Sequence, residues 1–244
     1  MTRNAIIMAA GMSSRFAPLS LETPKALLNV KNEIMIERQI GQLRKAGIDE
    51  IVIVVGYLKE KFEYLKEKYQ VVLIENPYYK KMNNFSTLYV AREYLKNTWI
   101  CSADNYFAEN VFMEESENAF YASEYADGVT EEWCIKTDDT GKIVDVQIGG
   151  ENAWVMKGHV FFNEKFSEQL IPYLEKAFQN EELWDEYWEN LYMAHMDKME
   201  MYIRKYDAGI IEEFDSIDEL REFDAKYKEC TGSKVLQEIS DKFN

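Results

Sequence analysis

Positively charged side chains follow the first apolar run of the chain at a spacing suited to phosphate binding. The run at residues 6–10 ends at Gly11, and the polar stretch after it contains Arg15 and Lys25. A glycine turn after a buried strand, followed by the small or flexible residues 12–14, allows backbone amides to face a ligand. Arg15 and Lys25 would add positive charge beside these amides. This order of residue types is typical of a loop that holds phosphates.

A carboxylate stands at one place where it could hold a metal ion. The apolar run at residues 99–104 ends on Asp104. An Asp there either caps the next turn or binds Mg²⁺, which proteins hold with one or two carboxylates plus substrate phosphates. If it binds Mg²⁺, its partner should be a second acid that the fold brings close.

Composition limits the class of protein. The 244 residues are 47% apolar and 30% charged, with a net charge of −16, which indicates a globular protein and argues against nucleic acid as partner. No apolar stretch approaches the length of a membrane span, and we expect no signal peptide. Three cysteines without metal-type spacing favour a reducing, cytoplasmic location. The acidic surface would attract a cationic substrate.

The first half alternates strands and helices, which predicts an α/β fold with a mostly parallel sheet and helices on both faces. We expect strands at residues 6–10, 51–55, 71–74 and 99–104, and helices around residues 36–46, 58–69 and 85–95. Ligands of such sheets bind at the carboxyl ends of the strands. The polar or glycine residues expected at or just past those ends are Gly11, Gly56, Asn76 and Asp104.

The second half predicts more strands at first and more helices later. We expect strands at 118–125, 132–137, 142–148, 153–162 and 199–206, a hairpin turn at 138–141, and helices at 165–178, 182–196 and 216–227. Pro172 would start or kink the first of these helices, and Ser216 would cap the last. We expect one domain at 1–228, with two halves at 1–116 and 117–228. Residues 229–244 would be a docked tail or the start of a lost downstream domain.

Three motifs resemble those of the nucleotidyltransferases that join a nucleoside monophosphate to a phosphorylated small molecule. They are AAGMSSR at 9–15, TPKAL at 23–27 and ADN at 103–105. The stretches VVGYLKEKFEYLKEKY, NNFSTLY, ADNYF, EEW and EYWEN look most like bacterial CTP:phosphocholine cytidylyltransferases. Many relatives have Gly where this chain has Ser13, although a Ser-Ser-Arg version also occurs. A Walker loop is absent. The resemblance implies a three-layer Rossmann-like nucleotidyltransferase fold with a mixed, mostly parallel central sheet and helices on both faces. It makes residues 1–116 the nucleotide-binding half and residues 117–228 the acceptor-binding half.

The resemblance also implies roles for particular residues. Lys25 would bridge the nucleotide and acceptor phosphates in the transition state, with Arg15 as a second phosphate contact. The segment at 212–220 resembles the one that supplies the second metal ligand, which makes Asp215 the partner of Asp104. Glu213 and Asp218 are the near competitors, and Asp218 could instead favour the N-terminus of a helix electrostatically. The expected nucleotide contacts are Ala9, Ala10, Gly11, Met12, Ser13, Ser14, Gly56, Asn83, Asn84, Ser86 and Ala103. Relatives read the base near Asn83, but Asn84 or Ser86 could equally cap the following helix.

The acceptor site is expected in the aromatic and acidic second half. A quaternary ammonium cannot donate ordinary hydrogen bonds, so aromatic faces and carboxylates recognise it. We expect Trp133 and Tyr187 as walls of such a cage. Trp184 and Trp188 would share one face of a helix, which is also the pattern of a core stripe. The full expected set is Tyr106, Glu132, Trp133, Tyr187, Trp188 and Glu189.

The function that follows is Mg²⁺-dependent transfer of CMP from CTP to phosphocholine, giving CDP-choline and pyrophosphate. The alternatives are the same transfer to 2-aminoethylphosphonate or phosphoethanolamine, a sugar-1-phosphate nucleotidyltransferase, and a catalytically dead nucleotide sensor. A phosphate monoester is already ionised, so no general base is needed, and His159 and His195 are interpreted as structural. A fused or partner downstream enzyme is a further possibility.

Overall fold

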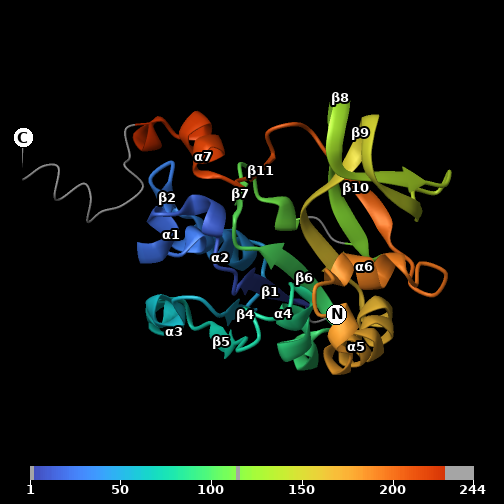
Figure 1. Cartoon of the computed structure of the whole chain (residues 1–244), viewed down its shortest axis with the longest axis horizontal. Coiled ribbons are helices and arrows are strands. Elements are labelled where there is room, and N and C mark those ends of the chain that lie inside the picture. Colours follow the sequence, from blue (N-terminus) through green and yellow to red (C-terminus); the bar gives the residue numbers. More distant parts are fainter. Residues whose placement is uncertain (1–2, 114–115, 229–244) are drawn as a thin grey trace, which may run out of the picture.

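The computed structural model describes residues 3–113 and 116–228, and Figure 1 shows its central sheet with helices on both sides. The sheet has seven strands in the order β10-β8-β9-β6-β1-β4-β5. Their bounds are β1 Arg3–Ala9, β4 Glu50–Val55, β5 Val72–Glu75, β6 Asn97–Ser102, β8 Phe120–Thr137, β9 Ile143–Phe162 and β10 Tyr202–Tyr206. Strands from both halves of the chain thus build one sheet.

The pairing pattern places β1 at the centre of a parallel core. β1 pairs in parallel with both β4 and β6, and β4 pairs in parallel with β5. β9 joins this core antiparallel to β6, and β8 lies antiparallel to β9. The sheet is therefore mixed and mostly parallel in its first half, as the sequence predicts. The carboxyl ends of β1, β4, β5 and β6 all meet at one edge.

Alternate side chains of β1 pack against different helices, because a strand turns successive side chains to opposite faces. Ile6 packs with the interior faces of α4 (Phe85–Val90), α5 (Glu164–Gln179) and α6 (Trp188–Met193). Ala5 and Ile7 pack with those of α2 (Met35–Lys45), η3 (Lys59–Phe62) and α3 (Tyr64–Tyr69). The prediction of helices on both faces is confirmed.

One long bent hairpin replaces the four strands expected between residues 118 and 162. β8 and β9 pair along their whole lengths with several register shifts, two of them at Ala126/Val129 and Thr130/Trp133. Gly128, Gly149 and Asn152 have positive φ at this bend. The predicted turn at 138–141 joins the two strands, with Gly141 at φ 84°. In Figure 1 the bent part of β8 and β9 lies at the top of the view.

The C-terminal segment returns to the N-terminal loop. β11 (Ile211–Glu213) pairs antiparallel with β7 (Asn105–Phe107), and α7 (Ile217–Phe223) follows with Ser216 in a capping box, as predicted. Figure 1 shows α7 above the loop elements, which are η1 Ser14–Phe16, α1 Leu19–Glu22, η2 Lys25–Leu27, β2 Asn29–Val30 and β3 Glu33–Ile34. Phe214 and Leu220 are buried against Phe16 and Leu28 of this loop.

Several predicted helices differ from the structure. The helix expected at 182–196 is wrong: η6 (Glu181–Leu183) and α6 are separate, so Trp184 and Trp188 do not share a helical face. Pro172 lies inside α5, which begins after its N-cap Asn163. Shorter 3₁₀ turns complete the fold at η4 Arg92–Tyr94, η5 Val111–Met113 and η7 Ala225–Tyr227.

The predicted tail at 229–244 and Cys230 lie outside the described residues. Within the described chain, Cys101 and Cys134 are free and buried. No helix in that part of the chain has the length and apolarity to cross a membrane.

Candidate active site

A cavity of about 240 Å³ lies at the carboxyl ends of β1, β5 and β6. Its wall includes most of the residues predicted to contact the nucleotide. These are Ala9, Ala10, Gly11, Ser13, Asn83, Asn84 and Ala103, and the wall also includes Lys25, predicted to be catalytic, and Asp104, predicted to bind the metal. Met12, Ser14, Gly56 and Ser86 do not line it. Asn76, which the sequence placed at a strand end, is also part of the wall, with Tyr79, Met82 and Thr87.

The glycines and Ser13 shape the loop beside this cavity. A Cβ on Gly56 would lie 2.7 Å from the Ala10 carbonyl oxygen and 2.9 Å from the Tyr79 ring, so only glycine allows this close approach. A Cβ on Gly11 would meet nothing within 4 Å, which leaves the loop open to a ligand. Ser13 has φ 48°, a left-handed conformation that glycine adopts more easily. That preference accounts for the Gly expected at this position in many relatives.

Lys25 lies between the nucleotide cavity and the C-terminal segment. Its Nζ lies 2.8 Å from Asp104 Oδ2 and donates a hydrogen bond of 2.6 Å to the Phe214 carbonyl. The lysine side chain is only 10% exposed, and its ammonium lies 5.0 Å from the centre of the Phe16 ring. Pro24 and the 3₁₀ turn after it place Lys25 in this position. The ammonium is therefore fixed by contacts from three separate segments.

Three carboxylates gather beside this lysine. Asp215 Oδ1 lies 2.9 Å from the Arg15 guanidinium. The pKa of Glu213 is raised to about 8, because protein surrounds its carboxyl and because Asp104 and Asp215 add negative charge. Glu213 as a whole residue is nevertheless exposed to solvent. Asp218 lies outside this group, since it pairs with Arg221 on α7.

The acidic cluster fits a divalent cation. Asp104 Oδ1 is buried and has no hydrogen-bond partner, so it could bind a ligand that the chain itself does not supply. A cation would also relieve the repulsion that raises the pKa of Glu213. No three acidic, His or Cys side chains of the described residues are preassembled as a metal site. Mg²⁺ does not require such a cluster, because substrate phosphates complete its coordination.

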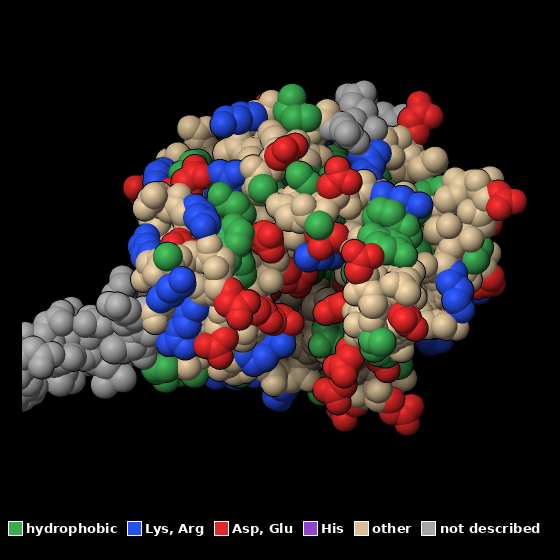
Figure 2. Space-filling model, turned by 90° about the horizontal axis from the view of Figure 1, so that it is seen from above, with side chains coloured by type: hydrophobic (Ala, Val, Ile, Leu, Met, Phe, Trp, Pro, Cys, Tyr) green, Lys and Arg blue, Asp and Glu red, His purple; other side chains and the backbone are tan. Residues whose placement is uncertain are grey.

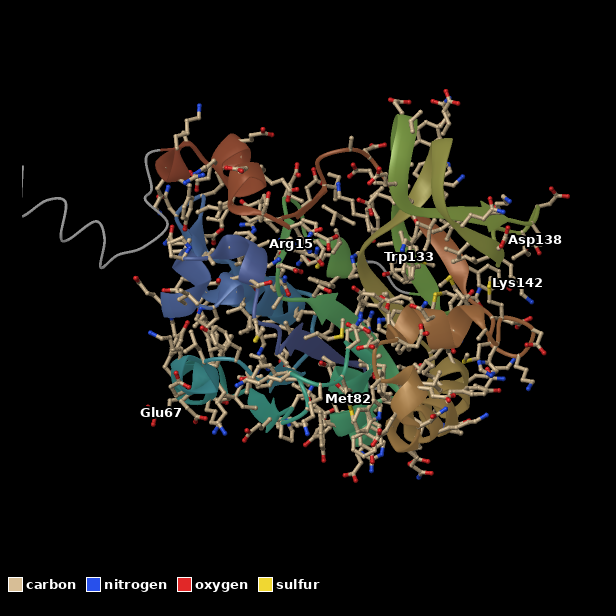
Figure 3. The ribbon with its side chains drawn as sticks, in the orientation of Figure 1. Arg15, Glu67, Met82, Trp133, Asp138 and Lys142 are labelled. Carbon is tan, nitrogen blue, oxygen red and sulfur yellow. The ribbon has the colours of Figure 1, made fainter. Side chains whose placement is uncertain are left out.

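A second cavity, of about 620 Å³, adjoins the first. It contains four of the predicted acceptor residues, Glu132, Trp133, Tyr187 and Glu189, together with Arg15 and Asp215. Figure 3 shows Arg15 and Trp133 on opposite sides of it. Figure 2 shows this face of the molecule hollowed near its centre, with Asp and Glu side chains on both sides of the hollow.

The aromatic wall consists of Trp133 and Tyr187 but not Trp188. The rings of Trp133 and Tyr187 meet edge to face, with centroids 5.9 Å apart and an interplanar angle of 87°. Trp188 is fully buried and lies parallel to Tyr121 at 6.0 Å, so its placement at the cavity wall is corrected. Tyr106 is also outside both cavities, where its ring packs on Phe223.

Glu189 is the deepest carboxylate of the second cavity. It is 9% exposed and accepts hydrogen bonds from Tyr121 Oη at 3.2 Å and from Asn84 Nδ2 at 3.2 Å. Burial raises its pKa to about 7, although these two hydrogen bonds act in the opposite direction. Glu189 is therefore poised between its neutral and ionised forms near neutral pH. A cation bound beside it would favour the ionised form.

The polar side chains expected to read the base are largely occupied by the protein. Asn83 Oδ1 accepts from the amide of Asn84, and its Nδ2 donates to the Asp185 carbonyl. Asn84 makes no side-chain cap for α4 and bonds instead to the 188–189 backbone and side chain. Ser86 lies inside α4, where its hydroxyl donates to the Asn83 carbonyl, so it does not cap the helix. Tyr79 and Thr87 also line this cavity.

The sequence did not predict several residues that line the second cavity. Tyr121, Glu124, Tyr125 and Lys157 also line it, and Glu124 Oε1 lies 3.0 Å from Lys157 Nζ. Charged residues that alternate along a strand look like a solvated face, so no signal marked them.

Neither histidine lines either cavity. His159 is buried among aromatic rings, where burial and then the charge of Arg204 lower its pKa to about 3. His195 Nδ1 bonds to the Leu191 carbonyl.

Comparison with known proteins identifies the family to which this chain belongs. Residues 5–132 match the family model of the MobA-like NTP transferase domain. A choline-phosphate cytidylyltransferase of Streptococcus pneumoniae is 36% identical over 220 residues, which cover 90% of this chain and 96% of that protein. The chain therefore belongs to the MobA-like NTP transferase family, and it is a nucleotidyltransferase.

One further relative and one solved structure are also similar to this chain. A 2-aminoethylphosphonate cytidylyltransferase of Lancefieldella rimae is 38% identical over 228 residues, covering 92% of this chain and 93% of that protein. The solved structure of a CTP:phosphocholine cytidylyltransferase from Streptococcus pneumoniae has a TM-score of 0.87 at 36% identity, covering 91% of this chain and 97% of that one. The predicted nucleotidyltransferase fold is thus confirmed.

Proposed function

We propose that the protein transfers CMP from CTP to a phosphorylated amino-alcohol, with phosphocholine as the favoured acceptor. The observation that carries this proposal is the Lys25–Asp104 ion pair at 2.8 Å in the wall of the first cavity. Lys25 also bonds to Phe214, whose neighbours Glu213 and Asp215 line the acidic, aromatic second cavity. An oxygen of the acceptor phosphate attacks the α-phosphorus of CTP. The new P–O bond forms as the bond to the pyrophosphate oxygen breaks.

The chain's own cations act on the charge of the transferred phosphoryl group. Lys25 is held in place before substrate binds, so its ammonium stabilises the equatorial oxygens without reorganisation. Arg15 is 68% exposed and pairs with Asp215 at 2.9 Å; it is free to exchange that carboxylate for a phosphate, because an exposed ion pair contributes only about 0–1 kcal/mol. The acceptor phosphate is already ionised, so the reaction requires no general base.

Asp104 and Asp215 would hold Mg²⁺, with Glu213 as the neighbouring carboxylate. The buried, unpartnered Oδ1 of Asp104 supports this assignment. Bound there, the ion would neutralise phosphate charge beside Lys25. The cytoplasm, which supplies CTP, is the compartment that we infer for the reaction.

The walls of the second cavity support phosphocholine as acceptor. The faces of Trp133 and Tyr187 would attract a trimethylammonium by about 0.5–2 kcal/mol each, and Glu132 and Glu189 would add charge attraction. A second candidate acceptor is 2-aminoethylphosphonate. Its primary ammonium could donate hydrogen bonds to the deep carboxylate of Glu189, and a relative of that activity is 38% identical to this chain.

A pyrophosphate-release screen tests the proposal. The four NTPs are each combined with phosphocholine, phosphoethanolamine, 2-aminoethylphosphonate and a sugar 1-phosphate, in the presence of Mg²⁺. We expect release with CTP and with phosphocholine as the best acceptor. A preference for the primary amines would replace the acceptor but leave cytidylyl transfer standing. Release only with a sugar phosphate, or with none of these compounds, would contradict the proposal.

A further inference from the structure

The turn at residues 103–104 carries the Asp104 carboxylate between the end of β6 and the start of β7. The Ala103 amide donates to the Met8 carbonyl at 3.1 Å, which attaches the turn to β1. The side chain of Asn105, which follows the turn, is fully buried, but neither its Nδ2 nor its Oδ1 has a hydrogen-bond partner in the described chain. The Asn105 side chain therefore does not hold this turn in place.

Gln39 of α2 connects the two ends of the turn. Its Nε2 donates to the Ser102 carbonyl at 2.9 Å and to the Asn105 carbonyl at 2.7 Å. Ser102 is the last residue of β6, and Asn105 is the first residue of β7. Both partners are acceptors, so the donor group of the amide has to face the turn. Gln39 is 1% exposed, so bulk water does not compete for its amide.

The packing of α2 explains why a buried amide is placed at this position. The helix buries Ile36, Ile40 and Leu43 in the core on its side of the sheet. Position 39 lies on the same face of the helix, one turn from both 36 and 43. Figure 1 shows α2 beside β7, with which it is in contact. A buried amide is unfavourable unless it is hydrogen-bonded, and the two carbonyls of the turn supply its acceptors.

The same bonds bear on the carboxylates of the C-terminal segment. Asn105 pairs with Glu213 across the antiparallel ladder of β7 and β11, and Asp215 follows two residues later. The place of Asn105 therefore sets how far this segment lies from Asp104. The carboxyl group of Asp104 pairs through Oδ2 with Lys25 and keeps a buried Oδ1 without a partner.

We propose that Gln39 is a positioning residue for the metal, whose amide holds the turn so that Asp104 presents Oδ1 to Mg²⁺ beside the carboxylates at 213–215. The inference rests on the proposed function, because it takes Asp104 as a metal ligand. Gln39 lines neither cavity, so it acts only through the turn. Mg²⁺ requires nearly ideal octahedral geometry, which makes its binding sensitive to the place of each carboxylate.

The same helix offers a matched control variant. Gln42 is 7% exposed and also donates from Nε2 to two carbonyls, those of Phe107 at 3.0 Å and Glu109 at 3.1 Å. These carbonyls lie at the far end of β7 and beyond it. Gln39→Met and Gln42→Met thus each remove one buried amide and two hydrogen bonds at nearly constant volume. Only Gln39→Met removes bonds to the turn of Asp104.

Mn²⁺ binding measures the effect without turnover. Mn²⁺ is titrated into the enzyme loaded with one equivalent of α,β-methylene CTP, which cannot release pyrophosphate. Water-proton relaxation distinguishes Mn²⁺ on the slowly tumbling protein from Mn²⁺ on the free analogue. We expect the Mn²⁺ Kd to rise about 10- to 100-fold in Gln39→Met, the usual effect of removing a group that orients a metal ligand. Gln42→Met should keep the wild-type Kd.

Turnover and thermal unfolding separate positioning from a general loss of structure. Both variants should lower the Tm by similar amounts, because each loses the same kind of buried bonds. Only Gln39→Met should raise the Mg²⁺ concentration for half-maximal activity, and excess Mg²⁺ should restore most of its turnover. Its KM for the acceptor at saturating Mg²⁺ should stay at the wild-type value. A loss of turnover that excess Mg²⁺ does not restore would contradict the inference.

Hydrogen exchange tests the turn in the absence of any ligand. The Ala103 amide, which bonds to Met8, should exchange faster in Gln39→Met than in wild type or in Gln42→Met. Gln39→Asn replaces Gln39→Met if the latter does not fold, because it keeps an amide on a side chain one methylene shorter. We expect the same direction of change in exchange and in Mn²⁺ Kd, since the shorter side chain does not reach both carbonyls. Wild-type values in the folded variant would contradict the inference.

The outcomes separate this inference from the function on which it rests. An unchanged Mn²⁺ Kd in Gln39→Met, or an equal rise in Gln42→Met, overturns the positioning role and leaves cytidylyl transfer intact. Wild-type Mn²⁺ binding in Asp104→Asn overturns the metal assignment and the inference with it. A selective loss of Mn²⁺ affinity in Gln39→Met, in an enzyme that turns over no phosphorylated amine, supports the positioning role and refutes the proposed acceptor class.

Discussion

Replacing Lys25 with Met removes one ammonium and keeps most of the side-chain volume. In the native protein this ammonium donates to the Phe214 carbonyl at 2.6 Å and pairs with Asp104 Oδ2 at 2.8 Å. The carboxyl group of Asp104 already has one buried oxygen without a partner. After the substitution Asp104 Oδ2 loses its cationic partner, and the Phe214 carbonyl loses its hydrogen-bond donor.

The magnitudes differ for stability and for catalysis. Leaving buried polar groups unsatisfied costs about 1–3 kcal/mol of unfolding free energy, which lowers the Tm of a chain of this size by about 2–4 °C for each kcal/mol. Removing a preorganised donor to transition-state charge costs about 2.7–4 kcal/mol, or about 100- to 1,000-fold in turnover. We therefore expect a folded variant with turnover lowered at least about a hundredfold.

The assay is pyrophosphate release with CTP and the acceptor at 25 °C, together with thermal unfolding. Lys31→Met is the matched control, because the Lys31 ammonium packs on the Phe223 ring outside both cavities. It should keep nearly wild-type turnover. If Lys25→Met released pyrophosphate at nearly the wild-type rate, Lys25 would have no part in the chemistry, and the reasoning from its contacts would be refuted.

Three further predictions concern the carboxylates and the aromatic wall. Asp215→Asn should raise the Mg²⁺ concentration for half-maximal activity at least about tenfold, whereas Asp218→Asn should leave it unchanged; the reverse ranking in a Mg²⁺ titration would show that the second ligand is misassigned. Trp133→Ala should raise the phosphocholine KM about five- to thirtyfold, from about 1–2 kcal/mol of lost cation–π attraction, with the KM for CTP unchanged; equal effects on both would argue against a cage. The pKa of Glu189 is raised to about 7, so its carboxylate is lost as pH falls through 7, and acceptor kcat/KM should fall with it. Glu189→Gln should lack that part of the pH profile, and an identical profile in both proteins would exclude Glu189 from acceptor binding.

The fold of the first half follows from local patterns. Each buried strand is a short apolar run that ends at a polar or glycine residue, and each helix between strands has one apolar face, so the alternation could be predicted. The bend of β8 and β9 could not. Its register shifts depend on glycines and on Asn152 with φ 53°, and a break in apolar alternation has the same pattern whether a strand ends or bends.

The residues of the candidate site likewise fall into those that the sequence predicts and those that it does not. The place of Lys25 at the cavity could be predicted from its motif, and that of Asp104 from a motif that coincides with the end of a strand. The aromatic composition of the second half predicts Trp188 at the acceptor wall, but tertiary packing decides its place, and Trp188 is fully buried. Tyr106 likewise packs on Phe223 outside both cavities. Asn84 shows the limit most clearly, since its partners lie 104 and 105 positions away, a pairing that no local spacing indicates.

The return of the C-terminal segment to the first loop has a consequence for protein synthesis. Lys25 and the Phe214 carbonyl are 189 positions apart, and Arg15 and Asp215 are 200 apart. A nascent chain that has completed β1, β4, β5 and β6 has the nucleotide loop but lacks β11, and with it the partner of β7 and the carbonyl that fixes Lys25. The bond that fixes Lys25 and the Arg15–Asp215 pair therefore form only after the segment at 211–215 has left the ribosome, later than the four strands of the parallel core.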